Sequence, residues 1–244
     1  MPQQKTNDEF TFYGLIGSTL IDYPGLIAST VFTLGCNFRC PYCQNRELAL
    51  SVKDTLSEYP ASLVLQHTAR DNNAWIDGIC ITGGEPLLSD KIETAIRKFK
   101  AAGLKVKVDT NGGFPKRLSA LIDKDMIDYV AMDVKAPFTE EEYSKATGVP
   151  AERWLPAVRE SVEILKAARI ETEFRTTCVP GLHTPEAIER LARDIAPCRM
   201  YSLQKFRPHN TLDPSYEQVP EPKPQEMEEL LEAARQHVPA AQLR

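Results

Sequence analysis

Apolar and polar residues alternate along this chain in two periods, one typical of strands and one typical of helices. Short apolar runs with strand character occupy residues 29–34, 78–82, 105–109, 129–134, 172–179 and 200–206. Helix-like spacing fills intervals near 58–70, 90–102, 115–123, 155–169 and 184–195. Strands that alternate with helices predict βαβ units with right-handed crossovers, and therefore one parallel sheet.

The pattern changes after the last predicted strand. Residues 208–224 (PHNTLDPSYEQVPEPKP) are rich in proline, which predicts an ordered surface segment or linker. An amphipathic helix is predicted over 225–236. We therefore divide the chain into residues 1–207, which carry the sheet and its helices, and residues 208–244, which carry the proline-rich segment and the last helix.

Polar and flexible residues gather where the predicted strands end. The second strand ends in TGGEP (82–86), the third in DTNG (109–112) and the fourth in DVK (133–135), while the fifth carries Arg175 and Thr177. In a parallel β/α barrel the carboxyl ends of the strands form one rim, where active sites are built. A requirement for stability alone does not favour polar groups after every strand, so this pattern predicts an active site at that rim.

Three of the six cysteines lie within eight residues, directly after the first predicted strand. Cys36, Cys40 and Cys43 follow Gly35 in the stretch LGCNFRCPYC. A structural zinc site and a ferredoxin cluster each prefer four protein ligands. Three thiolates on one cuboidal iron–sulfur cluster would leave one iron open. Two alternatives remain for this stretch alone: a catalytic zinc site with water as fourth ligand, or a redox pair of Cys40 and Cys43.

The other three cysteines are isolated along the chain. Cys80 and Cys178 sit in the apolar runs GICIT and TTCVP, and Cys198 stands alone further on. A free cysteine in an apolar run behaves as a small hydrophobic residue. We expect these cysteines to pack in the interior.

Length and composition restrict the setting. A chain of 244 residues with 42% hydrophobic and 26% charged residues is long enough for one large α/β domain. The net charge of −5 argues against a nucleic-acid partner, and no apolar run approaches the ~18 residues that cross a membrane. The first ten residues, MPQQKTNDEF, lack the apolar core of a signal peptide. We therefore expect a cytoplasmic protein without a membrane or nucleic-acid partner.

Two motifs together resemble a known family. CNFRCPYC, with an aromatic residue before the third cysteine, and TGGEP on the next strand are similar to motifs of the radical S-adenosylmethionine (SAM) superfamily. More narrowly, LIDYPGLIASTVFTLGCNFRCPYCQN, DTNG, AMDVKAP and EFRTT resemble the anaerobic ribonucleotide reductase activating protein family in its longer form. This resemblance spans residues 13–207.

The resemblance implies a fold and a chemistry. The fold is a partial (β/α)6 barrel of the radical SAM type with a short C-terminal extension. Cys36, Cys40 and Cys43 hold a [4Fe–4S] cluster, and SAM binds its open iron. Reductive cleavage of SAM gives methionine and a 5′-deoxyadenosyl radical, while the protein binds and orients the cofactors.

The resemblance also places side chains around SAM. Gly83 and Gly84 allow a backbone edge near the methionine moiety, because a Cβ would obstruct it. Glu85 lies beside the SAM ammonium, and Tyr42 contacts the adenine. Related activases place a histidine on the last strand, where this chain has Phe206, which could stack instead.

Charged residues complete the implied SAM site. Asp133 and Lys135 alternate along a strand and point to one face, so Asp133 can accept from the amino group while Lys135 pairs with the carboxylate. Arg175 lies near the ribose and carboxylate. By analogy, Asp109 and Asp133 with the Thr110 backbone bind a monovalent cation. His183 and His209 lie in predicted loops, where we expect them to be solvated.

The implied reaction needs partners. For an activase the substrate is a glycine in a glycyl radical enzyme, here an anaerobic ribonucleotide reductase, and the electron donor is a flavodoxin or ferredoxin. Two other classes stay open at this point. One is a radical SAM enzyme for a small molecule, similar to carboxy-deazaguanine synthase, and the other is a non-catalytic metal-binding protein.

Overall fold

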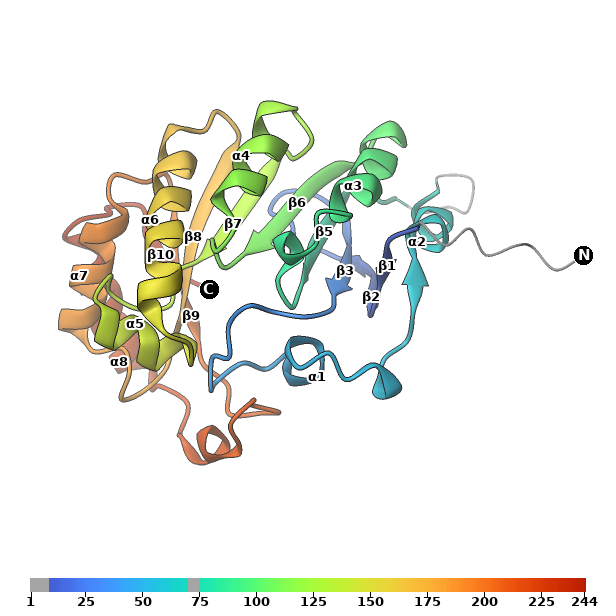
Figure 1. The fold of residues 1–244 in the computed structure, drawn as a ribbon. Helices are drawn as coiled ribbons and strands as arrows, with labels where there is room; N and C mark the ends of the chain where they lie inside the picture. Colours follow the sequence, from blue (N-terminus) through green and yellow to red (C-terminus); the bar gives the residue numbers. More distant parts are fainter. Residues whose placement is uncertain (1–8, 70–74) are drawn as a thin grey trace, which may run out of the picture.

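An eight-stranded, mostly parallel sheet forms the framework of the protein (Figure 1). The structure, a computed structural model, describes residues 9–69 and 75–244. The order of the strands is β10-β9-β8-β7-β6-β5-β3-β2, and only β2 runs antiparallel to its neighbour. The strands are β2 (Leu15–Thr19), β3 (Ala28–Thr33), β5 (Gly78–Gly83), β6 (Lys105–Thr110), β7 (Tyr129–Asp133), β8 (Glu171–Cys178), β9 (Tyr201–Lys205) and β10 (Ala241–Leu243). A small sheet pairs β1 (Thr11–Phe12) with β4 (Tyr59–Pro60).

All six predicted strands are confirmed, as β3 and β5 to β9, with ends that differ by at most one residue. Each of β5 to β9 lies beside the predicted strand before it and parallel to it, as βαβ units require. The sequence pattern did not reveal β2 and β10. β2 is mostly exposed at the edge of the sheet and β10 has three residues, so neither carries a buried apolar run.

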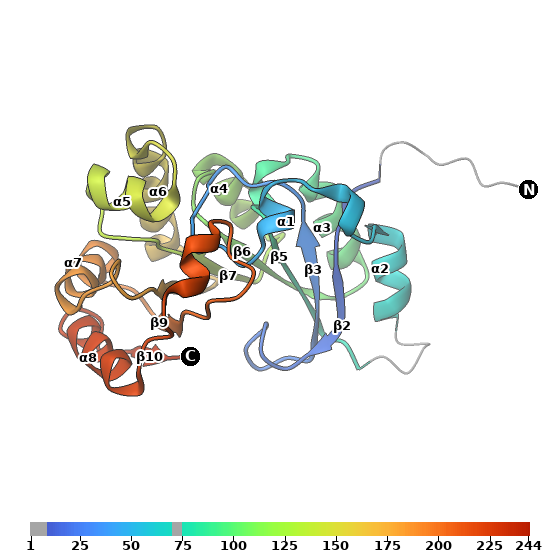
Figure 2. The same ribbon diagram turned by 90° about the horizontal axis from the view of Figure 1, so that it is seen from below.

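Helices form an arc around the strands, which gives a partial barrel (Figure 2). They are α1 (Arg46–Ala49), α2 (Ala61–Thr68), α3 (Ile92–Ala101), α4 (Pro115–Asp123), α5 (Glu140–Thr147), α6 (Ala151–Ala167), α7 (Pro185–Ile195) and α8 (Pro224–Arg235). The helix predicted at 58–70 begins at Ala61, because 59–60 form β4, and residue 70 lies outside the described residues. The helix predicted at 155–169 begins four residues earlier, at Ala151, with Pro156 inside it. The sequence reading missed α5, which Thr139 caps by accepting from the Glu142 N–H.

The two faces of the strands differ in character. On β6, Val106 and Val108 are fully buried in the hydrophobic core. Lys107 and Asp109 point the other way, into the barrel, where Asp109 meets Arg175 of β8. The barrel interior is therefore lined with charged groups, which must pair with one another because they are shielded from water.

Residues 208–244 extend the barrel instead of forming a separate appendage. α8 packs against α7, and β10 pairs in parallel with β9, with Ala241 opposite Tyr201. The unit β9–α8–β10 thus repeats the β/α pattern and adds a seventh parallel strand. At the end of β10, the Arg244 guanidinium donates to the carbonyl of Ile21, which lies after β2 at the opposite edge of the sheet.

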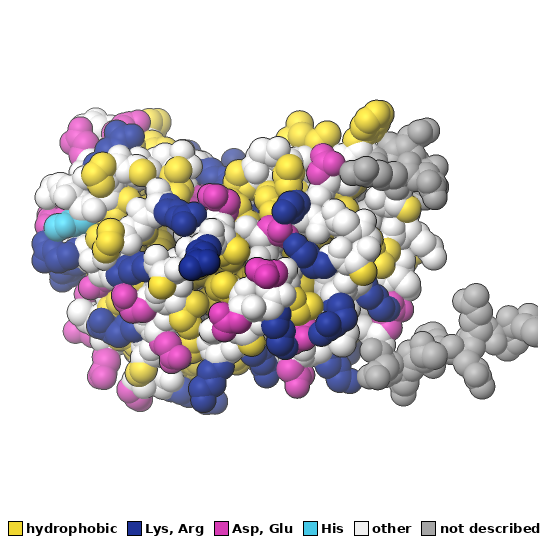
Figure 3. Space-filling view, turned by 90° about the horizontal axis from the view of Figure 1, so that it is seen from above, with side chains coloured by type: hydrophobic (Ala, Val, Ile, Leu, Met, Phe, Trp, Pro, Cys, Tyr) yellow, Lys and Arg dark blue, Asp and Glu magenta, His cyan; other side chains and the backbone are white. Residues whose placement is uncertain are grey.

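The outer surface shows no concentration of one charge on the face in Figure 3, where basic and acidic side chains are interspersed. Over the described part of the chain, none of the helices combines the length and the apolar character needed to cross a bilayer.

Candidate active site

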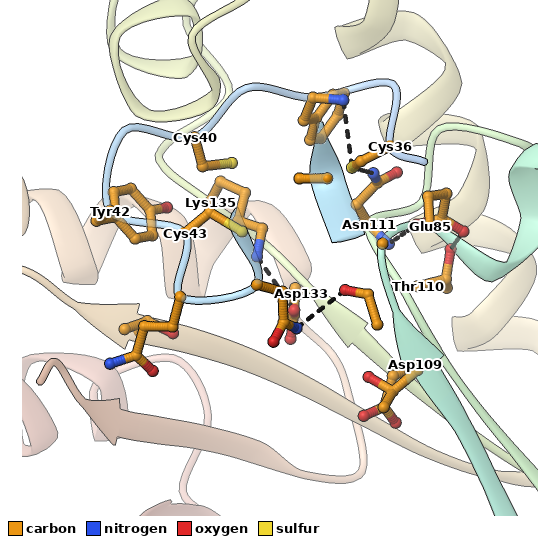
Figure 4. Close-up of a pocket in the computed structure, with 18 residues that line it drawn as sticks. Cys36, Cys40, Tyr42, Cys43, Glu85, Asp109, Thr110, Asn111, Asp133 and Lys135 are labelled. Carbon is orange, nitrogen blue, oxygen red and sulfur yellow. Dashed lines mark hydrogen bonds and ion pairs between the residues drawn. The ribbon is translucent and has the colours of Figure 1, made fainter. Parts of the chain in front are cut away.

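The three clustered cysteines lie on the loop between β3 and α1, which we call the cysteine loop (residues 34–45). Cys40 is buried, Cys36 and Cys43 are partly buried, and all three are free thiols. The loop begins at Gly35, whose φ of +84° favours glycine and whose N–H donates to the Leu48 carbonyl over 2.8 Å. Figure 4 shows Cys40 and Cys43 close to Lys135, with Cys36 near Asn111.

The cysteine loop is held at its start by the turn after β5. Gly84 N–H donates to the Thr33 carbonyl over 2.9 Å, and Glu85 N–H donates to the Gly35 carbonyl over 2.7 Å. A Cβ on Gly84 would come within 2.0 Å of the Gly35 oxygen. Glycine at this position is therefore needed for contact between two protein segments, a different reason from the approach of a cofactor that the sequence suggested. Gly83 is similar, because its φ is +112° and a Cβ would meet Thr33 backbone atoms.

The proline-rich segment holds the other end of the loop. Leu212 N–H donates to the Cys43 carbonyl and Asp213 N–H to the Pro41 carbonyl, both over 2.9 Å. The Gln44 side chain donates to the Arg207 carbonyl over 2.6 Å. η4 (Pro214–Gln218) follows, and its Tyr216 ring lies 6.3 Å from the Tyr42 ring. The segment predicted as a linker thus braces the cysteine loop.

A cavity of about 210 Å³ opens beside the cysteines. Nearly all predicted site residues line it: Cys36, Cys40, Tyr42, Cys43, Gly83, Gly84, Glu85, Asp109, Asp133 and Lys135. Asn45, Thr110, Asn111 and Thr177 line it as well. The rim motifs of four strands and the cysteine loop therefore meet at one cavity. Arg175 does not line it and acts through the aspartates instead.

The thiols suit a metal cluster. Burial and the nearby Glu85 carboxylate raise the pKa of Cys36 to about 11, and burial raises the pKa of Cys40 to about 12. Thiolates form here when iron binds, since the thiolate is the ligand. On the loop, Asn37 Nδ2 is buried without a hydrogen-bond partner in the described chain. Three soft sulfur donors from one loop at one cavity fit an iron–sulfur cluster.

Asn111 approaches this donor set from a neighbouring strand. Its Nδ2 lies 3.7 Å from Cys36 Sγ and donates to Asn37 Oδ1 over 2.8 Å. The Phe38 N–H also donates to Cys36 Sγ, over 3.4 Å. Sequence reasoning treated DTNG as a source of Asp109 and of backbone groups, and missed Asn111. One signal in the sequence could have revealed Asn111. DTNG ends the strand β6, which lies beside β5, the strand that ends in TGGEP.

Glu85 is buried and joins two rim motifs. Its carboxylate accepts from Leu87 N–H over 2.9 Å, from the Thr110 hydroxyl over 2.7 Å and from Asn111 N–H over 2.7 Å. Burial raises its pKa to about 7, although the three hydrogen bonds oppose the shift. Glu85 thus fastens the TGGEP turn to the DTNG turn while it faces the cavity.

Two carboxylates and two cations form a chain along the cavity wall, and Arg175 alone among them does not line the cavity. Arg175 Nε donates to Asp133 Oδ1 over 2.9 Å and Arg175 Nη1 to Asp109 Oδ2 over 3.1 Å, while Lys135 Nζ lies 3.1 Å from Asp133 Oδ2. Although burial opposes ionisation, Arg175 and Lys135 lower the pKa of Asp133 to about 2. Asp133 and Lys135 share a face, as their alternation predicted.

Tyr42, Phe206 and His183 are all buried, but of these three residues only Tyr42 lines the cavity. Tyr42 is buried at the cavity wall, where the sequence placed an adenine contact. Phe206 is fully buried in the hydrophobic core and is not a cavity residue. His183, expected to be solvated, is buried: its Nδ1 accepts from Val179 N–H over 2.9 Å, and its Nε2 lies 3.0 Å from the Lys135 carbonyl. Burial lowers the pKa of His183, so the neutral ring fixes the backbone of Lys135.

The isolated cysteines behave as expected. Cys80 and Cys178 are buried in the interior, and Cys198 is partly buried against the core. None of the three lines the cavity.

Comparison with known proteins identifies relatives of this arrangement. The profile of the radical SAM superfamily matches residues 30–195. A Methanocaldococcus jannaschii protein described as a "putative glycyl-radical enzyme activating enzyme" is 32% identical over 227 residues, covering 92% of each chain. The pyruvate formate-lyase 1-activating enzyme of Escherichia coli is 29% identical over 66% of this chain and 64% of its own.

Two further comparisons are more limited. The 7-carboxy-7-deazaguanine synthase of Thermoplasma acidophilum is 32% identical over 47% of this chain and 50% of its own. Among solved structures, a radical SAM methyltransferase from Sphaerobacter thermophilus superposes with a TM-score of 0.67, covering 93% of this chain and 68% of that one, at 17% identity. That structural likeness supports the partial-barrel fold alone.

Proposed function

This chain belongs to the radical SAM superfamily, and we propose that it installs a glycyl radical on an anaerobic ribonucleotide reductase. The observation that carries the activase part is the similarity to a glycyl-radical activating enzyme over 92% of both chains. A second activase, that of pyruvate formate-lyase, matches two thirds of this chain. The choice of the reductase as target rests on the sequence motifs from residues 13 to 207.

Family membership implies a [4Fe–4S] cluster and SAM, and the cavity offers groups for both. Cys36, Cys40 and Cys43 would hold the cluster through three of its irons. The bound cluster and SAM supply a reductive C–S cleavage that yields methionine and a 5′-deoxyadenosyl radical. The protein's own part is to bind, orient and shield these groups.

The cavity wall is suited to SAM as an amino acid joined to a nucleoside. Lys135 would pair with the carboxylate and Asp133 would accept from the amino group, since both line the cavity beside the cysteines. Glu85 also lines the cavity, where it would lie beside the SAM ammonium. Tyr42 offers an aromatic face for the adenine.

The remaining partners follow from the proposed reaction. The electron would come from a flavodoxin or ferredoxin, and the hydrogen atom from a glycine in the reductase. We place the reaction in the cytoplasm, which is consistent with six free cysteines in a reducing compartment.

The test uses the full chain, reconstituted with iron and sulfide without oxygen. It is mixed with SAM, a strong reductant and the anaerobic ribonucleotide reductase encoded in the same genome. We expect a glycyl radical signal by EPR, together with 5′-deoxyadenosine. Cys40→Ala should abolish both products, while Cys198→Ser should preserve both.

One outcome would redirect the proposal. If the full chain forms 5′-deoxyadenosine but yields no glycyl radical on that reductase or on any other glycyl radical enzyme of the organism, the activase function is wrong. The partial match to 7-carboxy-7-deazaguanine synthase makes a small-molecule substrate the second candidate.

A further inference from the structure

Lys107 is fully buried inside the barrel, two residues before Asp109 on β6. Its Nζ contacts Asp109 Oδ1, lies 3.5 Å from Cys80 Sγ and sits 5.7 Å from the centroid of the Tyr129 ring. A lysine is almost never fully buried unless its charge is paired. Its side chain pairs with Asp109, which lines the cavity.

The analogy with activases placed a monovalent cation on Asp109 and Asp133. Here protein cations already contact every oxygen of these carboxylates. Asp109 faces Lys107 through Oδ1 and Arg175 through Oδ2, and Asp133 faces Arg175 through Oδ1 and Lys135 through Oδ2. A bound metal ion would have to displace one of them, so these residues do not fit an exchangeable cation site.

The balance of charge leads to the same conclusion. Lys107 and Arg175 together occupy both oxygens of Asp109, so this carboxylate stays fully paired even if Lys135 turns from Asp133 to the carboxylate of SAM. A metal ion on Asp109 would therefore lie beside two protein cations in a site shielded from water, where like charges repel strongly.

We propose that the ammonium group of Lys107 is a built-in cation of the SAM site and takes the place of an exchangeable sodium or potassium ion. Lys107 does not line the cavity, so it acts as a positioning residue through Asp109. It holds that carboxylate in place, and Asp109 in turn holds the Arg175 guanidinium that orients Asp133. SAM binding should consequently be independent of monovalent metal ions.

The experiment measures SAM affinity of the reconstituted full-length protein by equilibrium dialysis at constant ionic strength. The salt is potassium, sodium or N-methyl-D-glucamine chloride, the last being too large for such a site. The wild type should bind SAM equally in all three. Lys107→Ala should bind at least about tenfold more weakly in N-methyl-D-glucamine and regain affinity with potassium or sodium, because removal of one partner of a buried charge pair is severe. Its melting temperature should also rise with potassium, through binding to the vacated site.

Two variants control the result. Lys107→Met keeps the length and apolar stem of the side chain without its charge, so it should bind SAM weakly in every salt and show no recovery with potassium or sodium. Lys105→Ala removes a lysine from the same strand whose partner is Asp128 outside the site, and it should match the wild type in every salt. The proposal fails if wild-type affinity rises about tenfold with sodium or potassium. It also fails if Lys107→Ala binds SAM equally in all salts, or if Lys107→Met binds SAM as tightly as the wild type. Neither outcome bears on the glycyl radical, which this experiment does not measure.

Discussion

At the scale of single residues, Asn111 connects the cysteine loop with the strand that carries Asp109. Its amide lies 3.7 Å from Cys36 Sγ, while its backbone N–H donates to Glu85. Hydrogen bonds to the sulfurs of an iron–sulfur cluster raise its reduction potential, because they stabilise the more negative reduced state. Asn111 is thus placed to raise the reduction potential of a cluster bound by the cysteines.

Asn111→Ala should therefore make the cluster harder to reduce without removing it. An EPR-monitored redox titration of the reconstituted protein should show a lower midpoint potential at unchanged iron content. Asn45→Ala removes a cavity amide whose bond goes to the Gly83 carbonyl and serves as control. An unchanged potential in Asn111→Ala would rule out this tuning role.

Lys135 offers a direct test of the SAM site. Lys135→Ala should leave the cluster intact and weaken SAM binding by on the order of 2–5 kcal/mol, because a buried charged contact to the SAM carboxylate is lost. Calorimetry on the reconstituted protein measures this. Lys145→Ala, on the exposed side of α5, should bind SAM as the wild type does. Equal affinity in Lys135→Ala and the control would place the SAM carboxylate elsewhere.

The raised pKa of Glu85 predicts how the free energy of unfolding depends on pH. Its pKa rises from 4.5 to about 7 on folding because the carboxyl is buried, so the folded state binds the proton more tightly. The stability that this group contributes is fully present below about pH 4.5 and is lost as the pH rises through about 7. The loss in the free energy of unfolding is on the order of 1–3 kcal/mol. Urea unfolding of the protein without cofactors should show this decline.

The matched variants for that measurement are Glu85→Gln and Glu152→Gln. The first removes the titration and should flatten the decline between those pH values, at a lower overall stability because the glutamine Nε2 cannot accept from Asn111. The second changes an exposed residue of α6 and should keep the wild-type profile. A wild-type slope in Glu85→Gln would assign the decline to another group.

At the scale of elements, the proline-rich segment is part of the site. Leu212 and Asp213 donate backbone N–H groups to the cysteine loop, so this segment fixes the position of Cys43. The sequence pattern predicted an ordered surface segment or linker over residues 208–224. The hydrogen bonds to Pro41 and Cys43 indicate a further role, the support of the cysteine loop.

Leu212→Pro tests that role because proline lacks the N–H that Cys43 accepts. The variant should lose its cluster faster in air, and its yield of 5′-deoxyadenosine should fall in the same proportion. Iron content and absorbance over time measure the first effect. Leu212→Ala keeps the N–H and should behave as the wild type. A stable cluster with a specific loss of the glycyl radical would instead make the segment a docking element.

The sequence predicts elements well where one contiguous run carries the information. Six buried strands and the motifs after them are local patterns, so the rim and most of its residues could be located. The pairing of Asn111 with Cys36, or of Leu212 with Cys43, joins segments far apart in the chain and has no local pattern. His183 was misjudged for the same reason, because its burial depends on the carbonyl of Lys135.

At the scale of the whole molecule, β10 and the last residue link the two edges of the sheet. Arg244 contacts the buried Glu173 on β8 and also the Ile21 carbonyl after β2. Glu173 accepts from Ser202 and Tyr129 as well, so the lower part of the barrel contains a second polar network. This network joins β7, β8 and β9 to the end of β10 and to the segment after β2.

Arg244→Ala should destabilise the fold by about 1–3 kcal/mol, because it leaves a buried carboxylate with fewer partners. Denaturant unfolding measures the loss. The double variant Arg244→Ala with Glu173→Gln should recover part of this loss, since the uncompensated charge is then gone. In the control double variant, Arg235→Ala on α8 with Glu173→Gln, the two effects on the free energy of unfolding should simply add. Additive effects of Arg244→Ala and Glu173→Gln would argue against a direct interaction.

The bracing of the cysteine loop by Leu212 and Asp213 also has a consequence for biosynthesis. The ribosome releases the three cysteines well before the segment that holds their loop, because hydrogen bonds such as that of Gln44 with Arg207 span 163 residues. A nascent chain therefore exposes its thiols while the loop still lacks half of its support. Delivery of iron and sulfide should follow completion of translation, and chains stalled before residue 207 should emerge without a stable cluster.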